Sequence, residues 1–547
     1  MNHTKQWTDV DVIVIGSGAG GLTAAVALAQ AGQKVLVLEQ HYLPGGWCQS
    51  FSLGGYRFSP GVHYIGEMGS RGRARRIFEG LGLGDDLEFY ELNPDGFDHI
   101  IVGSERFDIP KGLRTYMERL KNRFPKEREG IDSLFKVVNG LAHELDHMRE
   151  MNSIWDVLMM PFKSPHLAKW GLRSAETLIN AHAQNPLLRA ILASQAGDHG
   201  LPPSMAPAPV HAAVMAHYFN GGYYPKGGGG AIPKAMIRAL KKAGGDIKVR
   251  TSVDSILIEG GRAVGVRLAD QTEIRAKYVI SNADPHATFM RMVGWDHLSR
   301  GLKKRLEKTR YSTSSLSLFF AADIDPNAYG LDSGNYWHYQ DADVDGIYKK
   351  GLLAWDLKSE EIPGFFLTVT TLKDRSKNFG GKHTMESFAF VHHDAFKAWA
   401  QSHYGERPEE YKMMKEHLKD KMLGAVSRII PDIKERVVFA DLATPLTNAH
   451  YCNATLGNLY GTEKSKWQIG PWGYSVKTEF ENLYLCGAST VSHGVLGVMV
   501  SGLVAAQEIL KLPITELLKA RGPLVKIHRT PTPGAEHEIK VPAVAAA

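Results

Sequence analysis

Residues 11–46, DVIVIGSGAGGLTAAVALAQAGQKVLVLEQHYLPGG, constrain the fold of this chain more than any other stretch. Residues 12–15 are four apolar residues in a row, which is typical of a strand buried on both faces of a parallel sheet. The Ala- and Leu-rich residues 22–31 predict a helix that ends at Gly32, and residues 35–38 predict a second buried strand. The sequence therefore predicts a βαβ unit with a glycine-rich loop after its first strand.

The loop between the predicted strand and helix contains the pattern G-x-G-x-x-G at Gly16, Gly18 and Gly21. The first glycine permits a tight turn, the second lets the backbone approach a pyrophosphate, and the third lets the helix pack close to the strand. Ala19 adds a backbone N–H group near the start of the helix, where unpaired N–H groups and the positive end of the helix dipole attract phosphate. These four residues are candidate cofactor-binding residues.

Glu39 ends the second predicted strand about 20 residues after the glycines, as a dinucleotide-binding fingerprint requires. Its carboxylate can accept hydrogen bonds from ribose hydroxyls and would repel a 2′-phosphate, which favours FAD or NAD over NADP. Gln40 follows, and Gly45 and Gly46 come shortly after, so these residues join the candidate set. The alternative is an ordinary βαβ unit that uses glycine only for packing. The agreement of strand, helix, second strand and acid favours dinucleotide binding.

An acid followed shortly by a glycine pair resembles the FAD enzymes of the phytoene desaturase type. The resemblance implies that Gly45 and Gly46 lie near the pyrophosphate and the flavin, and that the dinucleotide is non-covalently bound FAD. Trp47 follows the pair at a position where members of that family often carry Arg, so one phosphate contact of the family is not matched here.

The nucleotide-binding pattern returns in residues 221–290. A loop of four glycines, 227–230, precedes a predicted helix over residues 232–243, and it is not a P-loop because no Gly-Lys-Ser/Thr follows. Alternating strands then lead to a strand at residues 278–280 and a loop that contains Asn282, a further candidate cofactor-binding residue. In the enzymes that the chain resembles, the backbone at the position of Val253 meets the adenine.

A last fingerprint occupies residues 482–510, where a strand at residues 483–486 runs into Gly487 and Ala488. A helix is predicted over residues 498–510, with Gly497 and Val498 at its start. This second helix N-terminus would place N–H groups at the flavin ring and the ribityl chain. Its place near the end of the chain matches the FAD enzymes named above, whose C-terminal segment completes the flavin site.

The segments between these fingerprints predict a second domain. Residues 71–220 have a mostly helical pattern, and residues 316–320, 365–370 and 386–391 predict an antiparallel sheet that roofs an apolar cavity. Residues 153–162, SIWDVLMMPF, predict either a buried helix, which we favour, or an interfacial membrane patch. The expected fold is α/β: a Rossmann-like FAD-binding domain, a parallel sheet with helices, interleaved with an α+β substrate domain. The FAD-binding domain takes residues 8–75, 221–290 and 436–522, the substrate domain takes residues 76–220 and 291–435, and residues 523–547 form a flexible tail.

Two proton-capable side chains, His63 and Tyr64, lie between glycines in the segment GVHYIG. In flavin enzymes of this fold the matching segment runs close to the isoalloxazine ring. These two residues are therefore the candidate catalytic residues, for proton delivery or orientation of the substrate. The alternative is that both are packed residues with satisfied hydrogen bonds.

Composition narrows the partners of this 547-residue chain, which is long enough for two domains. A net charge of +6 is modest for this length and does not predict a nucleic-acid partner. The three cysteines are odd in number and far apart, so we expect neither a disulfide framework nor a metal site. That pattern fits a reducing compartment. With no apolar leader or membrane span in sight, we expect a cytoplasmic protein, with contact at a membrane surface left open.

Several local strings are more specific than the FAD fold. They are GVHYIG at residues 61–66, GDHGLPPSMAP at 197–207, YPKGG at 224–228, TLKDRS at 371–376 and TPLTN at 444–448. Together they resemble the retinol saturase (all-trans-retinol 13,14-reductase) and carotenoid isomerase branch of the phytoene desaturase family. The resemblance spans about residues 11–510. It implies a polyene or isoprenoid substrate, a flavin that carries the hydride, and peripheral membrane contact.

The function expected from this resemblance is an FAD-dependent oxidoreductase acting on CH–CH groups of an apolar retinoid or carotenoid, as a saturase. Saturation of an unactivated C=C bond needs a hydride, which reduced flavin supplies and no side chain can. A carotenoid desaturase or cis–trans isomerase is the alternative. A non-enzymatic alternative is a lipid-binding escort protein of the GDP-dissociation-inhibitor type, against which the intact Gly16, Gly18, Gly21, Glu39 and Gly487 argue. Because the chain has one full dinucleotide fingerprint, NAD(P)H would need a site of another kind, or another electron donor reduces the flavin.

Overall fold

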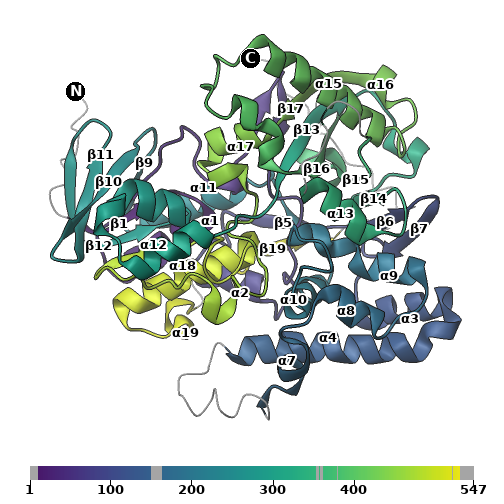
Figure 1. Cartoon of the computed structure of the whole chain (residues 1–547), viewed down its shortest axis with the longest axis horizontal. Helices are drawn as coiled ribbons and strands as arrows, with labels where there is room; N and C mark the ends of the chain where they lie inside the picture. Colours follow the sequence, from purple (N-terminus) through teal and green to yellow (C-terminus); the bar gives the residue numbers. More distant parts are fainter. Residues whose placement is uncertain are drawn as a thin grey trace.

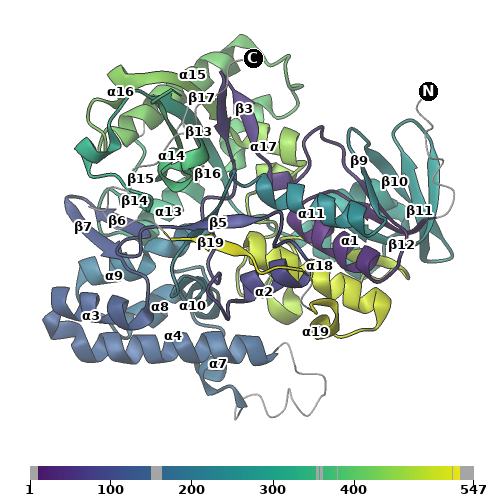
Figure 2. The same cartoon turned by 180° about the vertical axis from the view of Figure 1, so that it is seen from behind.

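Two seven-stranded sheets organise the computed structural model, which describes residues 10–148, 163–352, 357, 361–377, 380–519 and 522–529. Figures 1 and 2 show them side by side, the first near the N-terminus and the second below the helices α15 (Glu409–Val426) and α16 (Ile433–Arg436). The predicted helix at residues 153–162 lies outside the described residues. None of the helices in the described part of the chain has both the length and the apolar character needed to span a bilayer.

The first sheet has the strand order β10-β11-β12-β1-β2-β9, with β18 paired to β12. Strands β1 and β2 pair in parallel, as do β1 with β12, β12 with β18 and β2 with β9. The parallel pairing predicted from residues 11–46 is therefore confirmed, and the sheet is mixed because β11 pairs antiparallel with both β10 and β12. Its strands are β1 (Val10–Ile15), β2 (Val35–Leu38), β9 (Asp246–Lys248), β10 (Val253–Glu259), β11 (Arg262–Leu268), β12 (Glu273–Ser281) and β18 (Leu483–Leu485).

Both faces of this sheet are buried, which explains the continuous apolar runs in its central strands. Val12 and Val14 of β1 pack with the helices α1 (Ala19–Gln30), α11 (Ala231–Lys242) and α18 (Gly494–Leu510). Ile13 and Ile15 point to the other face, toward a π-helical segment (His286–Gly294) and α12 (Arg300–Lys308). Alternate residues of one strand thus belong to two different cores.

Helix α18 begins at Gly494, four residues before the predicted start at Val498. A Cβ atom on Gly497 would lie 2.7 Å from the Cβ atom of Ser492, so the loop before the helix can fold back only onto a glycine. Gly497 therefore lies inside the first turn of α18 and does not mark the start of the helix. Further along, Gly502 contacts the carbonyl oxygen of Gly20 on α1 so closely that a side chain there would clash. The two helices that begin at the predicted nucleotide site are packed directly against each other.

The second sheet has the order β17-β13-β16-β15-β14-β6-β7 and is antiparallel except where β14 pairs with β6. The antiparallel sheet predicted for the substrate domain is confirmed, and helices cover both of its faces. Its strands are β6 (Asp98–Val102), β7 (Glu105–Ile109), β13 (Ser314–Ala322), β14 (Asn335–Tyr339), β15 (Gly364–Val369), β16 (His383–Val391) and β17 (Val437–Ala443). The helices that cover one of these two faces are α3 (Leu113–Arg123), α4 (Arg128–Met148), α7 (Pro165–Trp170), α8 (Ala175–Asn180), α9 (Pro186–Ala193) and α10 (Ala208–His217).

Three details differ from the prediction. Strand β17 pairs with β13, so the segment that begins at residue 436 returns first to the second sheet and only later to the nucleotide-binding sheet. Residues 88–109, expected to be helical, form β5 (Glu88–Glu91), β6 and β7, because they pair with strands far away in the sequence. The flexible tail predicted from residue 523 was wrong for its first residues, since β19 (Lys526–His528) pairs with β5.

The remaining described elements are short. Gly54 and Gly55 form the turn between the antiparallel strands β3 and β4. These elements are β3 (Phe51–Leu53), β4 (Tyr56–Phe58), α2 (Arg73–Gly80), β8 (Tyr223–Pro225), α13 (Val344–Leu352), α14 (Thr370–Lys373), α17 (Pro445–Cys452) and α19 (Ile514–Leu517).

Candidate active site

One cavity of about 1330 Å³ is lined from both sheets. It is larger than the roughly 300–1,000 Å³ of an ordinary small-molecule pocket, so it has room for a dinucleotide and a second molecule. All the residues predicted for the site line it except Gly21. They are Gly16, Gly18, Ala19, Glu39, Gln40, Gly45, Gly46, His63, Tyr64, Val253, Asn282, Gly487, Ala488, Gly497 and Val498.

The glycine loop has the close contacts that its sequence pattern predicts. Gly16 has φ of +90°, a conformation that favours glycine. Gly21 lies against the carbonyl oxygen of Gly16, so it packs beneath the loop, which explains why it does not face the cavity. A Cβ atom on Gly18 would lie 2.5 Å from Nδ2 of Asn282. The second glycine of the motif is thus required by a neighbouring side chain as well as by any bound pyrophosphate.

Asn282 connects the three segments of the fingerprint. Its Oδ1 accepts a hydrogen bond from the backbone N–H of Gly21 at 3.0 Å and another from Sγ of Cys486 at 3.3 Å. The side chain therefore joins the glycine loop, the end of β12 and the end of β18. It holds the two helix starts in one arrangement and also lines the cavity.

Glu39 is 8% exposed, and its carboxylate organises the loops around it. Oε2 accepts hydrogen bonds from the backbone N–H of Ser17 at 2.9 Å and from its hydroxyl at 2.6 Å, while Oε1 accepts from the N–H of His41 at 2.8 Å. Ser17 Oγ in turn accepts from the N–H of Gly45 at 3.0 Å. Sequence reasoning missed Ser17, because the motif leaves that position open. A carboxylate has about four acceptor positions, so Glu39 can still accept from a ribose hydroxyl.

The glycine pair after Glu39 lies against the glycine loop. Gly45 has φ of +120° and Gly46 has φ of +55°. A Cβ atom on Gly46 would lie 3.4 Å from the Cα atom of Gly18. Two glycine segments separated by a helix and a strand therefore form one wall of the cavity.

These contacts fit a bound FAD. The starts of α1 and α18 both line the cavity, and the first N–H groups of a helix have no partner within the helix. The glycine loop would hold the pyrophosphate, and Glu39 would hold the adenosine ribose. Gly487 to Val498 would lie at the flavin end. Lys464 adds a feature that sequence reasoning missed: its buried ammonium donates to the carbonyl of Ala488, and burial lowers its pKa to about 7.

His63 lies on the cavity wall between aromatic rings. Its ring centroid is 5.0 Å from that of Phe366 and 5.7 Å from that of Phe388. Nδ1 is 3.2 Å from Oε2 of Glu386, whose other oxygen accepts a hydrogen bond from the N–H of Ser59 at 2.7 Å. The structure thus brings the predicted histidine together with a buried carboxylate from β16.

Tyr64 is 9% exposed and stacks on Tyr218, with ring centroids 4.3 Å apart and an interplanar angle of 11°. Its hydroxyl lies 2.9 Å from Oδ2 of Asp198 and 3.2 Å from Oδ2 of Asp98. Burial and the two carboxylates raise the pKa of this phenol well above its usual value. Sequence reasoning missed both aspartates, although Asp198 lies in the string GDHGLPPSMAP that carried the family resemblance.

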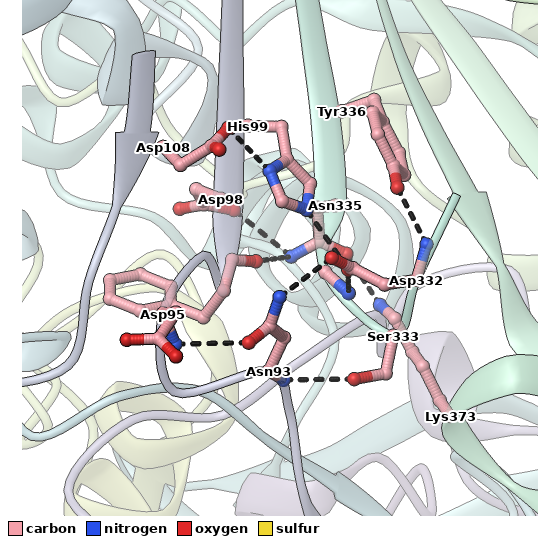
Figure 3. Close-up of polar contacts among 12 residues, drawn as sticks. Asn93, Asp95, Asp98, His99, Asp108, Asp332, Ser333, Asn335, Tyr336 and Lys373 are labelled. Carbon is pink, nitrogen blue, oxygen red and sulfur yellow. Dashed lines mark hydrogen bonds and ion pairs between the residues drawn. The ribbon is translucent and has the colours of Figure 1, made fainter. Parts of the chain in front are cut away.

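A second layer of polar groups surrounds Asp98 (Figure 3). Asn335 on β14, opposite Asp98 on β6, donates from Nδ2 to Asp98 Oδ1 at 3.0 Å and accepts from the ammonium of Lys373. Lys373 also donates to the carbonyl of His63 at 2.7 Å. Burial raises the pKa of Asp98 to about 6 and lowers the pKa of Lys373 to about 7.

The comparisons with known proteins agree with this geometry. A family model described as flavin containing amine oxidoreductase matches residues 19–300. The chain is 31% identical to the all-trans-retinol 13,14-reductase of Danio rerio, over 92% of this chain and 86% of that protein. It is 26% identical to the chloroplastic prolycopene isomerase of Daucus carota, over 92% of this chain and 80% of that protein. An oxidoreductase structure from Methanosarcina mazei, 18% identical, covers 92% of this chain and 100% of its own with a TM-score of 0.63, and shows the same fold.

The fold and the cavity define an FAD-dependent oxidoreductase. This chain belongs to the family of flavin-containing amine oxidoreductases, in the branch that includes the all-trans-retinol 13,14-reductases and the prolycopene isomerases. The resemblance predicted from the local sequence strings is confirmed, and so is the prediction of FAD as the cofactor. Membership of an enzyme family also decides against the lipid escort protein.

Proposed function

We propose that this enzyme acts on a C=C bond of a long apolar polyene, as a saturase of a retinoid or carotenoid. The observation that carries the proposal is that one cavity extends from the dinucleotide-binding loops to an aromatic wall. Trp337, Phe366, Phe388, Tyr218 and Tyr460 line that wall. Relatives named for retinol reduction and prolycopene isomerisation support a polyene as the substrate.

The protein has three tasks in such a reaction. Bound FAD in its reduced form supplies the hydride, which no side chain can. The aromatic wall would orient the polyene and exclude water, so that the reacting carbon meets only groups fixed by the fold. Tyr64 and His63 would orient the substrate or supply the proton, since both line the cavity beside the aromatic rings.

Cis–trans isomerisation of a carotenoid is the second candidate function, favoured by the 26% identical prolycopene isomerase. It needs the same apolar cavity and the same flavin, but it leaves the mass of the polyene unchanged. Desaturation would lower that mass by two hydrogens. The mass and the double-bond geometry of the product therefore separate the three outcomes.

We also propose peripheral contact with a membrane surface, through the segment that contains Lys466, Trp467 and Trp472. Trp467 and Trp472 are 61% and 48% exposed, and Lys466 lies over the Trp467 ring at 5.5 Å. Lys466 and Trp472 also line the cavity. Aromatic and basic side chains together favour the membrane interface, where an apolar substrate is dissolved.

The electron donor that reduces the flavin is a separate question, for which NAD(P)H is the first compound to test.

The test is a substrate panel with purified protein that carries chemically reduced FAD under anaerobic conditions. All-trans-retinol and prolycopene are incubated separately with this protein, putrescine is incubated with the protein in its oxidised form, and the products are analysed by chromatography and mass spectrometry. We expect a polyene product two hydrogens heavier than its substrate. A protein that oxidises putrescine when its flavin is oxidised, and changes neither polyene, would contradict the proposal.

A further inference from the structure

Two aspartates, the buried Asp98 and the partly buried Asp198, share one tyrosine hydroxyl at the wall of the cavity. Oη of Tyr64 is within hydrogen-bond distance of Asp198 and of Asp98, but a phenol has one proton and donates to one acceptor at a time. Neither aspartate forms an ion pair with any residue in the described ranges. Two carboxylates that share a site do not easily ionise together, so the arrangement favours an additional bound proton.

The surroundings of Asp98 and Asp198 also favour the additional bound proton. Asp98 is fully buried, and burial raises its pKa to about 6. Burial and the charge of Asp98 raise the pKa of Asp198 well above its usual value. His493 donates from Nε2 to the backbone carbonyl of Asp198 at 2.8 Å, yet burial lowers the pKa of this imidazole to about 3. His493 is therefore neutral at pH 7 and does not compensate a negative charge on Asp198.

The three groups are ordered from the protein interior toward the cavity. Asp98 is the innermost, and it is fixed by hydrogen bonds from Gln195 Nε2 at 3.1 Å and from Asn335, which Figure 3 shows between Asp98 and Lys373. Tyr64 and Asp198 both line the cavity. Oδ1 of Asp198 has no hydrogen-bond partner among the residues that the structure describes. The outermost carboxyl group can therefore offer one oxygen to a bound substrate.

We propose that Asp198, Tyr64 and Asp98 form a proton relay in which Asp198 protonates the substrate. The inference rests on the proposed function and adds the source of its proton. The O–H bond of Asp198 breaks as a C–H bond forms with the electron pair of the C=C bond. The hydride from reduced flavin completes the saturation at the neighbouring carbon. The shared proton reaches Asp198 from Asp98 through Tyr64 before this transfer. After it both aspartates are carboxylates, and solvent that reaches Asp198 through the cavity returns the proton. Asp198 is thus the catalytic residue, and Tyr64 and Asp98 act through it.

Other titratable or charged groups face the relay from the elements packed around it, and all of them enter its pH dependence. Around Asp198 they are His199, Tyr218, Tyr339, Tyr348, Tyr460 and His493, and around Asp98 and Lys373 they are Tyr116, Asp332, Lys377 and Glu386. A variant of one of these groups that does not contact Tyr64 serves as the control. Asp332 meets this condition, because its side chain pairs with His99 (Figure 3).

The first measurement needs no substrate. The infrared spectrum of the oxidised protein should contain a carbonyl band of a protonated carboxylic acid that shifts in D₂O. Asp198→Asn should remove or displace this band, and Asp332→Asn should leave it in place. A spectrum without a carboxylic-acid band sensitive to Asp198→Asn or Asp98→Asn overturns the relay, whatever the enzyme does with a polyene.

The second measurement follows the turnover of all-trans-retinol by variants that retain bound FAD, which reports that they have folded. Asp198→Asn should slow turnover about 10²- to 10⁴-fold, the usual contribution of a general acid, and Asp198→Glu should restore part of it. Asp98→Asn removes a negative charge beside Asp198 and so lowers its pKa. The fall in rate with rising pH should then occur at a lower pH than in the wild type, a change that a purely structural defect would not produce. Unchanged turnover in Asp198→Asn, or an unchanged pH profile in Asp98→Asn, contradicts the relay. A wild-type protein that turns over no polyene refutes the proposed function instead, and the infrared band still decides whether the proton is shared.

Discussion

Replacement of Glu39 by Ala should weaken FAD binding and remove hydrogen bonds that hold the loops around the site. A hydrogen bond to a charged group contributes about 1.5–3 kcal/mol, so loss of one ribose contact alone raises the dissociation constant roughly 10- to 150-fold. The same change leaves two N–H groups and one hydroxyl without the acceptor that they have in the structure, at 2.6–2.9 Å. The loops that contain Ser17 and Gly45 then lose the hydrogen bonds that position them, which weakens FAD binding further.

The assay is titration of the apoprotein with FAD, followed by the quenching of flavin fluorescence. Glu91→Ala is the matched control, because Glu91 has the same exposed fraction of 8% but pairs with Lys111 and does not line the cavity. The control should lose stability and keep its affinity for FAD. If Glu39→Ala binds FAD as tightly as the wild type, the carboxylate holds neither the ribose nor the loop, and the reasoning is refuted.

Three further predictions concern other parts of the molecule. Gly18→Ala should abolish FAD binding because its new methyl group meets a side chain at 2.5 Å, whereas Gly301→Ala, with 3.8 Å to its nearest neighbour, should bind FAD normally in the same titration. Lys373 has a folded-state pKa of about 7 against 10.5 in the unfolded chain, so the unfolded state binds more protons between these values and the free energy of unfolding should rise with pH there. Lys373→Met should flatten that rise in urea titrations at pH 7 and pH 9, and an equal slope in both proteins would contradict it. Trp467→Ser with Trp472→Ser should reduce sedimentation with anionic vesicles while FAD stays bound, and undiminished sedimentation would exclude this segment as the membrane contact.

The nucleotide-binding half could be predicted because its signals are local. The apolar run at residues 12–15, the glycine spacing after it and the acid at residue 39 lie within one βαβ unit, and each has a direct physical reason. The same applies to Gly45 and Gly46, whose positive φ angles require glycine. The start of α18 was misplaced, because a glycine inside a helix looks like a boundary when the loop packed against it is unknown.

The acidic cluster could not be predicted because it forms between distant segments. Tyr64 meets Asp98 and Asp198 across 34 and 134 residues of sequence, and no spacing rule connects them. Strands β6 and β17 were missed for the same reason, since each is defined by a partner strand from another part of the chain. The sequence did predict the polar pair at residues 63 and 64. Tyr64 of this pair contacts Asp98 and Asp198, the two residues that the sequence analysis did not identify.

A single-turnover spectrum tests the central claim most directly. The protein is reduced under anaerobic conditions and mixed with all-trans-retinol, and the flavin absorbance is followed while the product mass is measured. We predict that the oxidised flavin spectrum returns as the polyene gains two hydrogens, one equivalent for each flavin. A flavin that stays reduced in the presence of retinol and prolycopene, with both polyenes recovered unchanged, would contradict the account.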